Sequence, residues 1–235
     1  MVEQRSVRTI MFDAVGTLLF AKPNVVDVYH GLGATHGSRV TRDRVGDRFR
    51  TAVDLFHRRP GQGQLPMATS QDDEYRRWQS IVAYVFLDLS DTSDLFEALW
   101  NHFSKPEHWS VYDDVPATLQ TLRDRGFQLG IASNFDRRLE QIDEQLKLQI
   151  PDEFVFHSAG LGVRKPAKDF FRRIERACDL LSHQLLLVGD SREVDYLAAE
   201  QAGWQAVWLR RGSGDDLESG QISDLHQLSE VIAAC

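Results

Sequence analysis

The chain has 235 residues, of which 42% are hydrophobic and 26% charged, so a globular core can form without disulfides. The net charge of −8 argues weakly against a nucleic-acid partner, and no apolar run is long enough to predict a membrane span. The N-terminal stretch MVEQRSVRTI has no apolar signal core, and Cys178 and Cys235 show no pairing pattern. These features predict a cytoplasmic protein with reduced thiols.

Short apolar runs recur along the chain and predict β-strands at 8–12, 128–132, 154–156, 185–188 and 206–209. Most are continuous rather than alternating, which is typical of strands buried on both faces of a parallel sheet. From residue 115 onward, helical patterns alternate with them at 115–125, 136–147, 167–181 and 193–202. This order predicts an α/β fold with a doubly wound parallel sheet, and Asp114 is expected to cap the first of these helices.

The stretch 22–105 differs from the rest, because it contains no convincing strand and its apolar residues have helical spacing. The first group with this spacing is Val45, Phe49, Val53 and Phe56. The segment PGQGQLPMATS at 60–70 predicts a connection between two helices. The sequence therefore predicts a core domain of residues 1–21 and 106–235, interrupted by an α-helical domain of residues 22–105.

Polar residues stand at or just after the ends of the predicted strands. They are Asp13 with Gly16-Thr17, then Ser133-Asn134, then Lys165, and finally Asp190 with Asp195 a helical turn later. Ligands of open α/β sheets bind beyond the carboxyl ends of the strands, so we expect these side chains to converge there. Carboxylates beside a lysine and a hydroxyl suit an oxygen-ligated Mg²⁺ next to a phosphate.

The blocks DAVGT, SNFD, VRKP and GDSREVD, in this order, resemble the four motifs of the haloacid dehalogenase-like (HAD) superfamily. The helical insert resembles the cap that one subclass carries between the first and second motifs. The stretches SNFDRRLE and HWSVYDDV are similar to one branch within the superfamily. The resemblance spans essentially the whole chain and implies a HAD-like Rossmannoid core with an inserted α-helical cap.

The resemblance also implies a set of roles for the residues. Asp13 matches the nucleophile that forms an aspartyl-phosphate from a small phosphorylated metabolite. The implied phosphate contacts are Ser133, Asn134, Lys165 and Ala14, with Lys165 also neutralising the nucleophile. The implied Mg²⁺ ligands are Asp13, the backbone carbonyl of Val15 and Asp190, while Asp195 holds metal-bound water.

Val15 is the departure from this pattern, because the phosphatases of the superfamily carry there an aspartate that acts as acid and base. Positioned acid–base catalysis is worth about 10²- to 10⁴-fold in rate, so weakened turnover is expected. Two alternatives stay open. One is a metal- and phosphate-binding protein whose turnover has lapsed. The other is a 2-haloacid dehalogenase, whose similar first motif also lacks the acid, although the GDS wording at 189–191 favours a metal site.

Several neighbouring residues have simpler interpretations. Asp136 is expected to cap a helix, and Arg137 and Arg138 to lie on its solvated face. The aromatic residues Tyr75, Trp78 and Tyr84 are expected in the core of the helical insert rather than in a substrate pocket.

Overall fold

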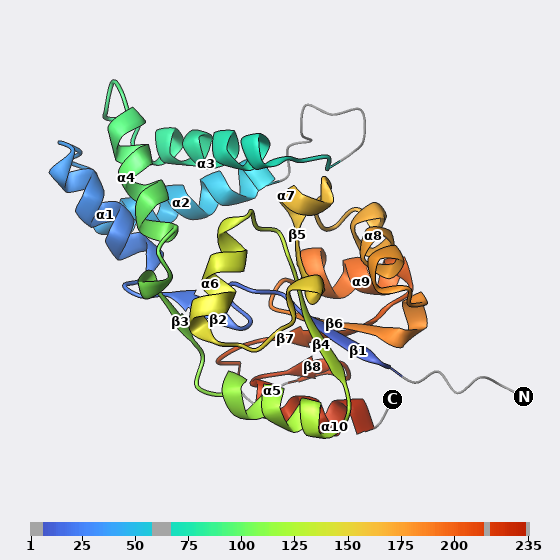
Figure 1. Ribbon diagram of the computed structural model, residues 1–235. Helices are drawn as coiled ribbons and strands as arrows, with labels where there is room; N and C mark the ends of the chain where they lie inside the picture. The colour runs from blue at the N-terminus through green and yellow to red at the C-terminus, as the bar shows by residue number, and fades with distance from the viewer. Residues whose placement is uncertain (1–6, 58–66, 214–216, 234–235) are drawn as a thin grey trace, which may run out of the picture.

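A six-stranded parallel sheet lies at the centre of the computed structural model, which describes residues 7–57, 67–213 and 217–233 (Figure 1). Its strand order is β5-β4-β1-β6-β7-β8. The central strand β1 pairs with β4 on one side and with β6 on the other, and the chain winds outward from it in both directions. The predicted doubly wound α/β fold is therefore confirmed.

The five predicted strands all form, with ends that differ from the prediction by at most one residue. They are β1 (Thr9–Phe12), β4 (Gln128–Ser133), β5 (Val155–His157), β6 (Leu185–Gly189) and β7 (Gln205–Leu209). The sixth strand, β8 (Gln221–Ile222), was not predicted, because two residues are too short to give an apolar run.

Helices cover both faces of the sheet. One apolar cluster joins the sheet to α5 (Val115–Asp124), α6 (Arg138–Leu146) and α10 (Leu228–Ala233), and another joins it to α7 (Ser158–Leu161), α8 (Lys168–Cys178) and α9 (Leu197–Ala202). Successive side chains of a strand point to opposite faces, so Ile10 and Phe12 enter the first cluster and Met11 the second. This double burial explains why the strand sequences are continuously apolar.

Some helix ends differ from the prediction. Helix α8 ends at Cys178, because Asp179 adopts the left-handed conformation with φ 52°. The stretch predicted as one helix at 193–202 consists of a π-helical turn, Arg192–Tyr196, followed by α9. Short 3-10 turns lie at Pro106–His108, Asp152–Phe154, Ser182–Gln184 and Leu225–Gln227.

Asp114 occupies the N-cap position of α5, as predicted, but its side chain makes no capping hydrogen bond. Its Oδ2 accepts a hydrogen bond from the backbone N–H of Leu225 at 2.8 Å. Arg211 donates from Nη1 to Oδ2 at 2.8 Å and from Nη2 to Oδ1 at 3.0 Å. The carboxylate therefore joins α5 to the C-terminal part of the chain, and a local capping pattern cannot reveal such distant partners.

The stretch between β1 and α5 carries four helices that bury an apolar cluster of their own (Figure 1). They are α1 (Val25–Thr35), α2 (Arg42–His57), α3 (Gln71–Val85) and α4 (Ser93–Phe103). We call these four helices the helical insert. Where the chain enters and leaves it, β2 (Leu19–Ala21) pairs antiparallel with β3 (Trp109–Val111), a ribbon that the sequence did not predict.

Two sequence expectations about the insert stay partly or wholly open. Its division from the core at residues 22 and 105 stays a prediction. Of the expected connection 60–70, residues 60–66 lie outside the described residues, whereas Ser70 caps α3 by accepting the backbone N–H of Asp73 at 3.1 Å.

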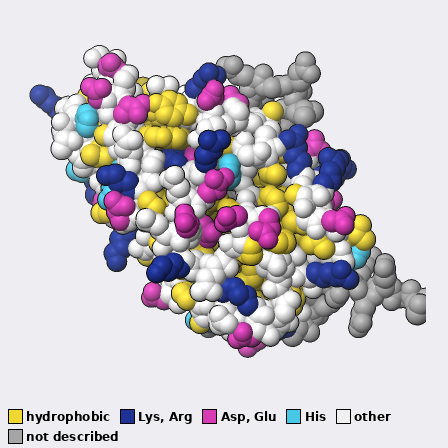
Figure 2. All heavy atoms as spheres, in the orientation of Figure 1, with side chains coloured by type: hydrophobic (Ala, Val, Ile, Leu, Met, Phe, Trp, Pro, Cys, Tyr) yellow, Lys and Arg dark blue, Asp and Glu magenta, His cyan; other side chains and the backbone are white. Residues whose placement is uncertain are grey.

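None of the helices among the described residues is long and apolar enough to cross a bilayer. Figure 2 shows acidic and basic side chains interspersed over the described part of the face seen in Figure 1.

Candidate active site

Asp13 leaves the sheet directly after β1, where its backbone N–H donates to the carbonyl of Val188 on β6 at 2.9 Å. A tight turn follows, in which the carbonyl of Ala14 accepts the N–H groups of the next residues, Thr17, Leu18 and Leu19, at 2.8 to 3.3 Å. The turn brings the nucleophile candidate to the carboxyl edge of the sheet, where ligands of such folds bind.

Gly16 in this turn has φ 92°, and a Cβ there would lie 2.3 Å from Oδ2 of Asp190. Only glycine combines this conformation with so close an approach of a carboxylate. Arg211 supports the turn from the far end of the sequence by donating from Nε to the carbonyl of Gly16 at 3.2 Å and from Nη2 to that of Thr17 at 2.6 Å.

Lys165 is buried, and its ammonium group joins two of the predicted carboxylates. Its Nζ donates to Oδ1 of Asp13 at 2.8 Å, to Oδ1 of Asp195 at 2.5 Å, and to the carbonyl of Ala132 at 2.8 Å. Burial alone would lower the pKa of Lys165, but the two carboxylates outweigh it and raise that pKa, so the side chain stays charged.

Asn134 positions Lys165 through the backbone. Its Nδ2 donates to the carbonyl of Lys165 at 3.0 Å, and its Oδ1 accepts the N–H of Lys165 at 2.8 Å. The preceding Ser133, at the end of β4, is buried and lines the same cavity as the lysine. The amide of Asn134 therefore links the second sequence block to the third, a contact that the sequence did not predict.

Three carboxylates gather beside Lys165. Asp13, Asp190 and Asp195 each offer an oxygen, and these oxygens lie within 4.8 Å of one another. Burial, together with repulsion from Asp13 and Asp195, raises the pKa of Asp190 to about 7, and burial raises that of Asp195 as well. Such a cluster suits a hard divalent cation, because the cation offsets the repulsion and prefers oxygen ligands.

Asp195 already has partners on both oxygens, since Oδ1 accepts from Lys165 and Oδ2 accepts the N–H of Ser191 at 3.0 Å. This engagement favours Asp13 and Asp190 as direct ligands and an indirect role for Asp195.

A cavity of about 690 Å³ lies between this edge of the sheet and the helical insert. The predicted site residues that line it are Asp13, Val15, Ser133, Asn134, Lys165, Asp190 and Asp195. Ala14 is fully buried behind them and is not among the lining residues. Val15 is 36% exposed, and its side chain brings no titratable group to the cavity.

Two expectations about the surroundings of the site are wrong. Trp78 lines the cavity instead of lying only in the insert core, whereas Tyr75 and Tyr84 are not among the lining residues. Arg138 also lines the cavity, and its side chain is only 12% exposed. Its Nε and Nη2 donate to the two oxygens of Asp136 at 2.8 and 2.6 Å, and its guanidinium lies 3.6 Å from the ring centroid of Trp100.

In the sequence, the position of Asp136 two residues before Arg138 was the signal from which this ion pair could have been predicted. Asp136 also accepts the backbone N–H of Arg138 at 3.1 Å, although Arg137 and not Asp136 occupies the N-cap position of α6. Arg137 is exposed as expected.

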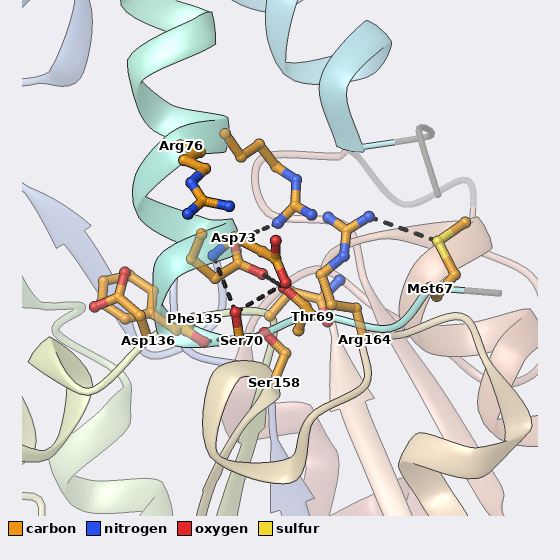
Figure 3. Close-up of polar contacts among 12 residues, drawn as sticks. Met67, Thr69, Ser70, Asp73, Arg76, Phe135, Asp136, Ser158 and Arg164 are labelled. Carbon is orange, nitrogen blue, oxygen red and sulfur yellow. Dashed lines mark hydrogen bonds and ion pairs between the residues drawn. The ribbon is translucent and has the colours of Figure 1, made fainter. Parts of the chain in front are cut away.

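The residues just before α3 also contact the segment that leads into Lys165 (Figure 3). The N–H of Thr69 donates to the carbonyl of Gly162 at 3.2 Å, and the N–H of Arg164 donates to that of Met67 at 3.0 Å. Figure 3 shows the Arg164 side chain extending toward Met67, with its Nη2 3.5 Å from the Met67 sulfur.

The same region contains a buried ionic cluster. Glu74 accepts the hydroxyl of Thr69 at 2.7 Å and pairs with Nη1 of Arg77 at 2.6 Å. Burial and the neighbouring charge of Arg77 lower the pKa of Arg164 to about 10, and the charge of Glu74 opposes this shift. We call Glu74, Arg77 and Arg164 the buried ionic cluster. It joins α3 to the residue directly before Lys165.

Comparison with known proteins gives a consistent picture. A family model described as haloacid dehalogenase-like hydrolase matches residues 7–203. Haloacid dehalogenase-like hydrolase domain-containing protein 3 from Mus musculus is 30% identical over 213 residues, which cover 86% of this chain and 82% of that protein.

Two solved structures at 19% identity share the fold. One is that of the HAD-hydrolase YfnB from Bacillus subtilis, bound to magnesium, with a TM-score of 0.76 over 97% of this chain and 99% of that chain. The other is that of the L-2-haloacid dehalogenase PA0810, with a TM-score of 0.73 over 98% of this chain and 100% of that chain. Because the family model covers most of its length, the chain belongs to the haloacid dehalogenase-like hydrolase family.

Proposed function

We propose that the protein hydrolyses small phosphomonoesters through an aspartyl-phosphate on Asp13, with Mg²⁺ as cofactor. The observation that carries this proposal is the contact between Lys165 Nζ and Asp13 Oδ1, in a cavity that also contains Ser133 and Asp190. A charged lysine on a carboxylate nucleophile lets a dianionic phosphate approach it.

In the proposed reaction, the Asp13 carboxylate attacks phosphorus and the ester P–O bond breaks, with its electron pair leaving on the ester oxygen. Water then attacks phosphorus and the bond between phosphorus and the Asp13 oxygen breaks, which releases inorganic phosphate and restores the carboxylate. A proton from this water balances the charge on the ester oxygen that left. Lys165 keeps Asp13 oriented and neutralises charge, while Ser133 offers a hydroxyl to the phosphate oxygens. When bound by Asp13, the Val15 carbonyl and Asp190, Mg²⁺ supplies further positive charge at the phosphate.

Labelling of Asp13 is expected when the protein is mixed with radiolabelled acetyl phosphate and MgCl₂ and quenched in acid. The phosphoryl group should persist long enough to be trapped, because Val15 cannot act as a base toward the attacking water. The measurement is the radioactivity retained on the protein, mapped by digestion to the peptide that contains Asp13.

Asp13→Asn should remove the label, whereas Asp113→Asn, which changes an exposed carboxylate, should keep it. Retained label on Asp13→Asn would show that the nucleophile is another residue.

The affinity for Mg²⁺ is expected to rise with pH up to about 7 and then to level off. Because the pKa of Asp190 is raised from 3.8 to about 7, a cation that binds below this pH displaces a proton. Calorimetric titrations with MgCl₂ at several pH values from about 5.5 to about 8.5 measure the trend.

The same shift means that Asp190 of the metal-free protein binds more protons in the folded than in the unfolded state between about pH 4 and about pH 7. The contribution of Asp190 to stability should therefore fall as pH rises through this range. An Mg²⁺ affinity that does not change across this range would contradict the assignment of Asp190 as a ligand.

Val15 favours a second candidate, a metal- and phosphate-binding protein without turnover. Tight binding of inorganic phosphate with Mg²⁺, but no labelled Asp13 and no product, would support this candidate. The 2-haloacid dehalogenase alternative predicts chloride release from 2-chloropropionate in the presence of a chelator. The acidic cluster at the cavity disfavours it, because three carboxylates beside one lysine repel the carboxylate of a haloacid unless a further cation binds.

A further inference from the structure

The part of the cavity beyond the carboxylates is walled by aromatic rings. Its ring-bearing lining residues are Tyr29, Phe49, Trp78, Phe103, Trp109 and Phe135. Each of the four helices of the insert contributes one of them, and the last two come from the core side. We call these six residues the aromatic wall.

The rings of the aromatic wall contact one another. The rings of Tyr29 and Phe49 meet edge to face with centroids 4.9 Å apart, and those of Phe49 and Trp78 stack with centroids 6.4 Å apart and planes 23° apart. Such a wall matches a flat apolar group rather than a sugar, because hydroxyl groups without partners lose free energy when they are buried.

Arg138 also lines this cavity and adds a hydrogen-bond donor to its wall. Its Nε and Nη2 donate hydrogen bonds to Asp136. Its Nη1 forms no hydrogen bond with any residue in the described part of the chain. The guanidinium is fixed over the ring of Trp100 at 3.6 Å and lies 5.4 Å from that of Phe135. Since Asp136 already neutralises the charge of Arg138, a hydrogen-bond acceptor fits Nη1 better than a second phosphate does.

We propose that the substrate is an aryl phosphate whose ring lies between the rings of the aromatic wall and carries a hydrogen-bond acceptor for Arg138. This inference rests on the proposed function and specifies an aryl oxide as the leaving group of the proposed hydrolysis. It agrees with the chemistry at Val15, because an aryl oxide leaves more readily without a proton than an alkoxide does. Arg138 is then a specificity-determining residue.

Phosphonates test the inference by binding alone, because their P–C bond is not hydrolysed. In titrations with MgCl₂ present, phenylphosphonate is expected to bind at least about tenfold more tightly than methylphosphonate, because the ring is buried in the aromatic wall. Phe49→Leu and Trp78→Leu should each reduce this ratio to below about threefold while leaving the affinity for inorganic phosphate unchanged. Leu55→Ala, an exposed change on the same helix as Phe49, should keep the full ratio.

The acceptor is tested with 4-nitrophenylphosphonate and 4-isopropylphenylphosphonate, which have similar shapes. The wild type should prefer the nitro compound by about fivefold or more, through one hydrogen bond from Arg138. The double variant Asp136→Asn/Arg138→Met should lose this preference without leaving an unpaired buried carboxylate, and unfolding curves check that it folds. An equal affinity of the wild type for the two compounds would show that Arg138 does not recognise an acceptor on the ring.

Equal affinities of the wild type for phenyl- and methylphosphonate would overturn the aryl assignment and leave the proposed function standing. Failure of inorganic phosphate and of every phosphonate to bind would overturn the proposed function and the assignment together.

Discussion

Val15→Asp is expected to raise kcat on alkyl phosphates by about 10²-fold or more, because it restores an acid for the leaving oxygen and a base for the attacking water. The side chain at this position is 36% exposed and opens on the cavity, so a carboxylate can be placed there without burying it in the sheet. The gain on 4-nitrophenyl phosphate should be smaller, since nitrophenolate leaves without protonation. Steady-state rates of phosphate release on both substrates measure the difference.

Val15→Asn is the matched control, because asparagine has nearly the same shape as aspartate but transfers no proton at neutral pH. It should leave kcat close to the wild-type value on both substrates. If Val15→Asp gives no gain while Mg²⁺ still binds, the missing acid is not what limits turnover. An equal gain from Val15→Asn would point to polarity or packing instead of proton transfer.

Glu74→Gln is expected to reduce the free energy of unfolding by about 3–5 kcal/mol, because it removes the carboxylate that pairs with the buried Arg77. Glu74 is 4% exposed and pairs with Arg77 at 2.6 Å, and its charge also acts on Arg164. Urea unfolding followed by circular dichroism measures the loss.

Glu144→Gln provides the control, since this glutamate is exposed on α6 and should cost less than about 0.5 kcal/mol. Adding Arg164→Met to Glu74→Gln should recover part of the lost stability, because it removes a buried positive charge that acts on Arg77 and roughly keeps the side-chain volume. Additive effects of the two substitutions would contradict a direct coupling between Glu74 and Arg164.

The sheet was predictable because each of its longer strands is an apolar run buried on both faces, a pattern visible in one sequence. The convergence of Asp13, Lys165 and Asp190 was predictable for a geometric reason, since the carboxyl ends of parallel strands meet at one edge. The resemblance of the four blocks to a known family then supplied roles that spacing alone does not reveal.

The contacts between distant segments were not predictable in the same way. Arg138 resembles any charged residue in the first turn of a helix, and only the fold brings Trp100 over its guanidinium. The side-chain partners of Asp114 lie about a hundred positions along the chain, so its N-cap position before α5 does not reveal that the carboxylate binds Arg211 and Leu225. Trp78 faces both the insert core and the cavity, and helical periodicity does not separate those surroundings.

Neighbouring positions of the first block differ sharply in what they tolerate. A Cβ at Gly16 would lie 2.3 Å from a carboxylate oxygen of Asp190, and one at Gly189 would lie 2.4 Å from Cγ of Asp195. Position 15, by contrast, faces open space in the cavity. If the proposed mechanism holds, a lineage of such proteins can lose or regain proton-transfer chemistry by changing one codon, while the glycine beside it admits no replacement. For enzyme engineers, residue 15 is the place to begin a library and residue 16 the place to leave untouched.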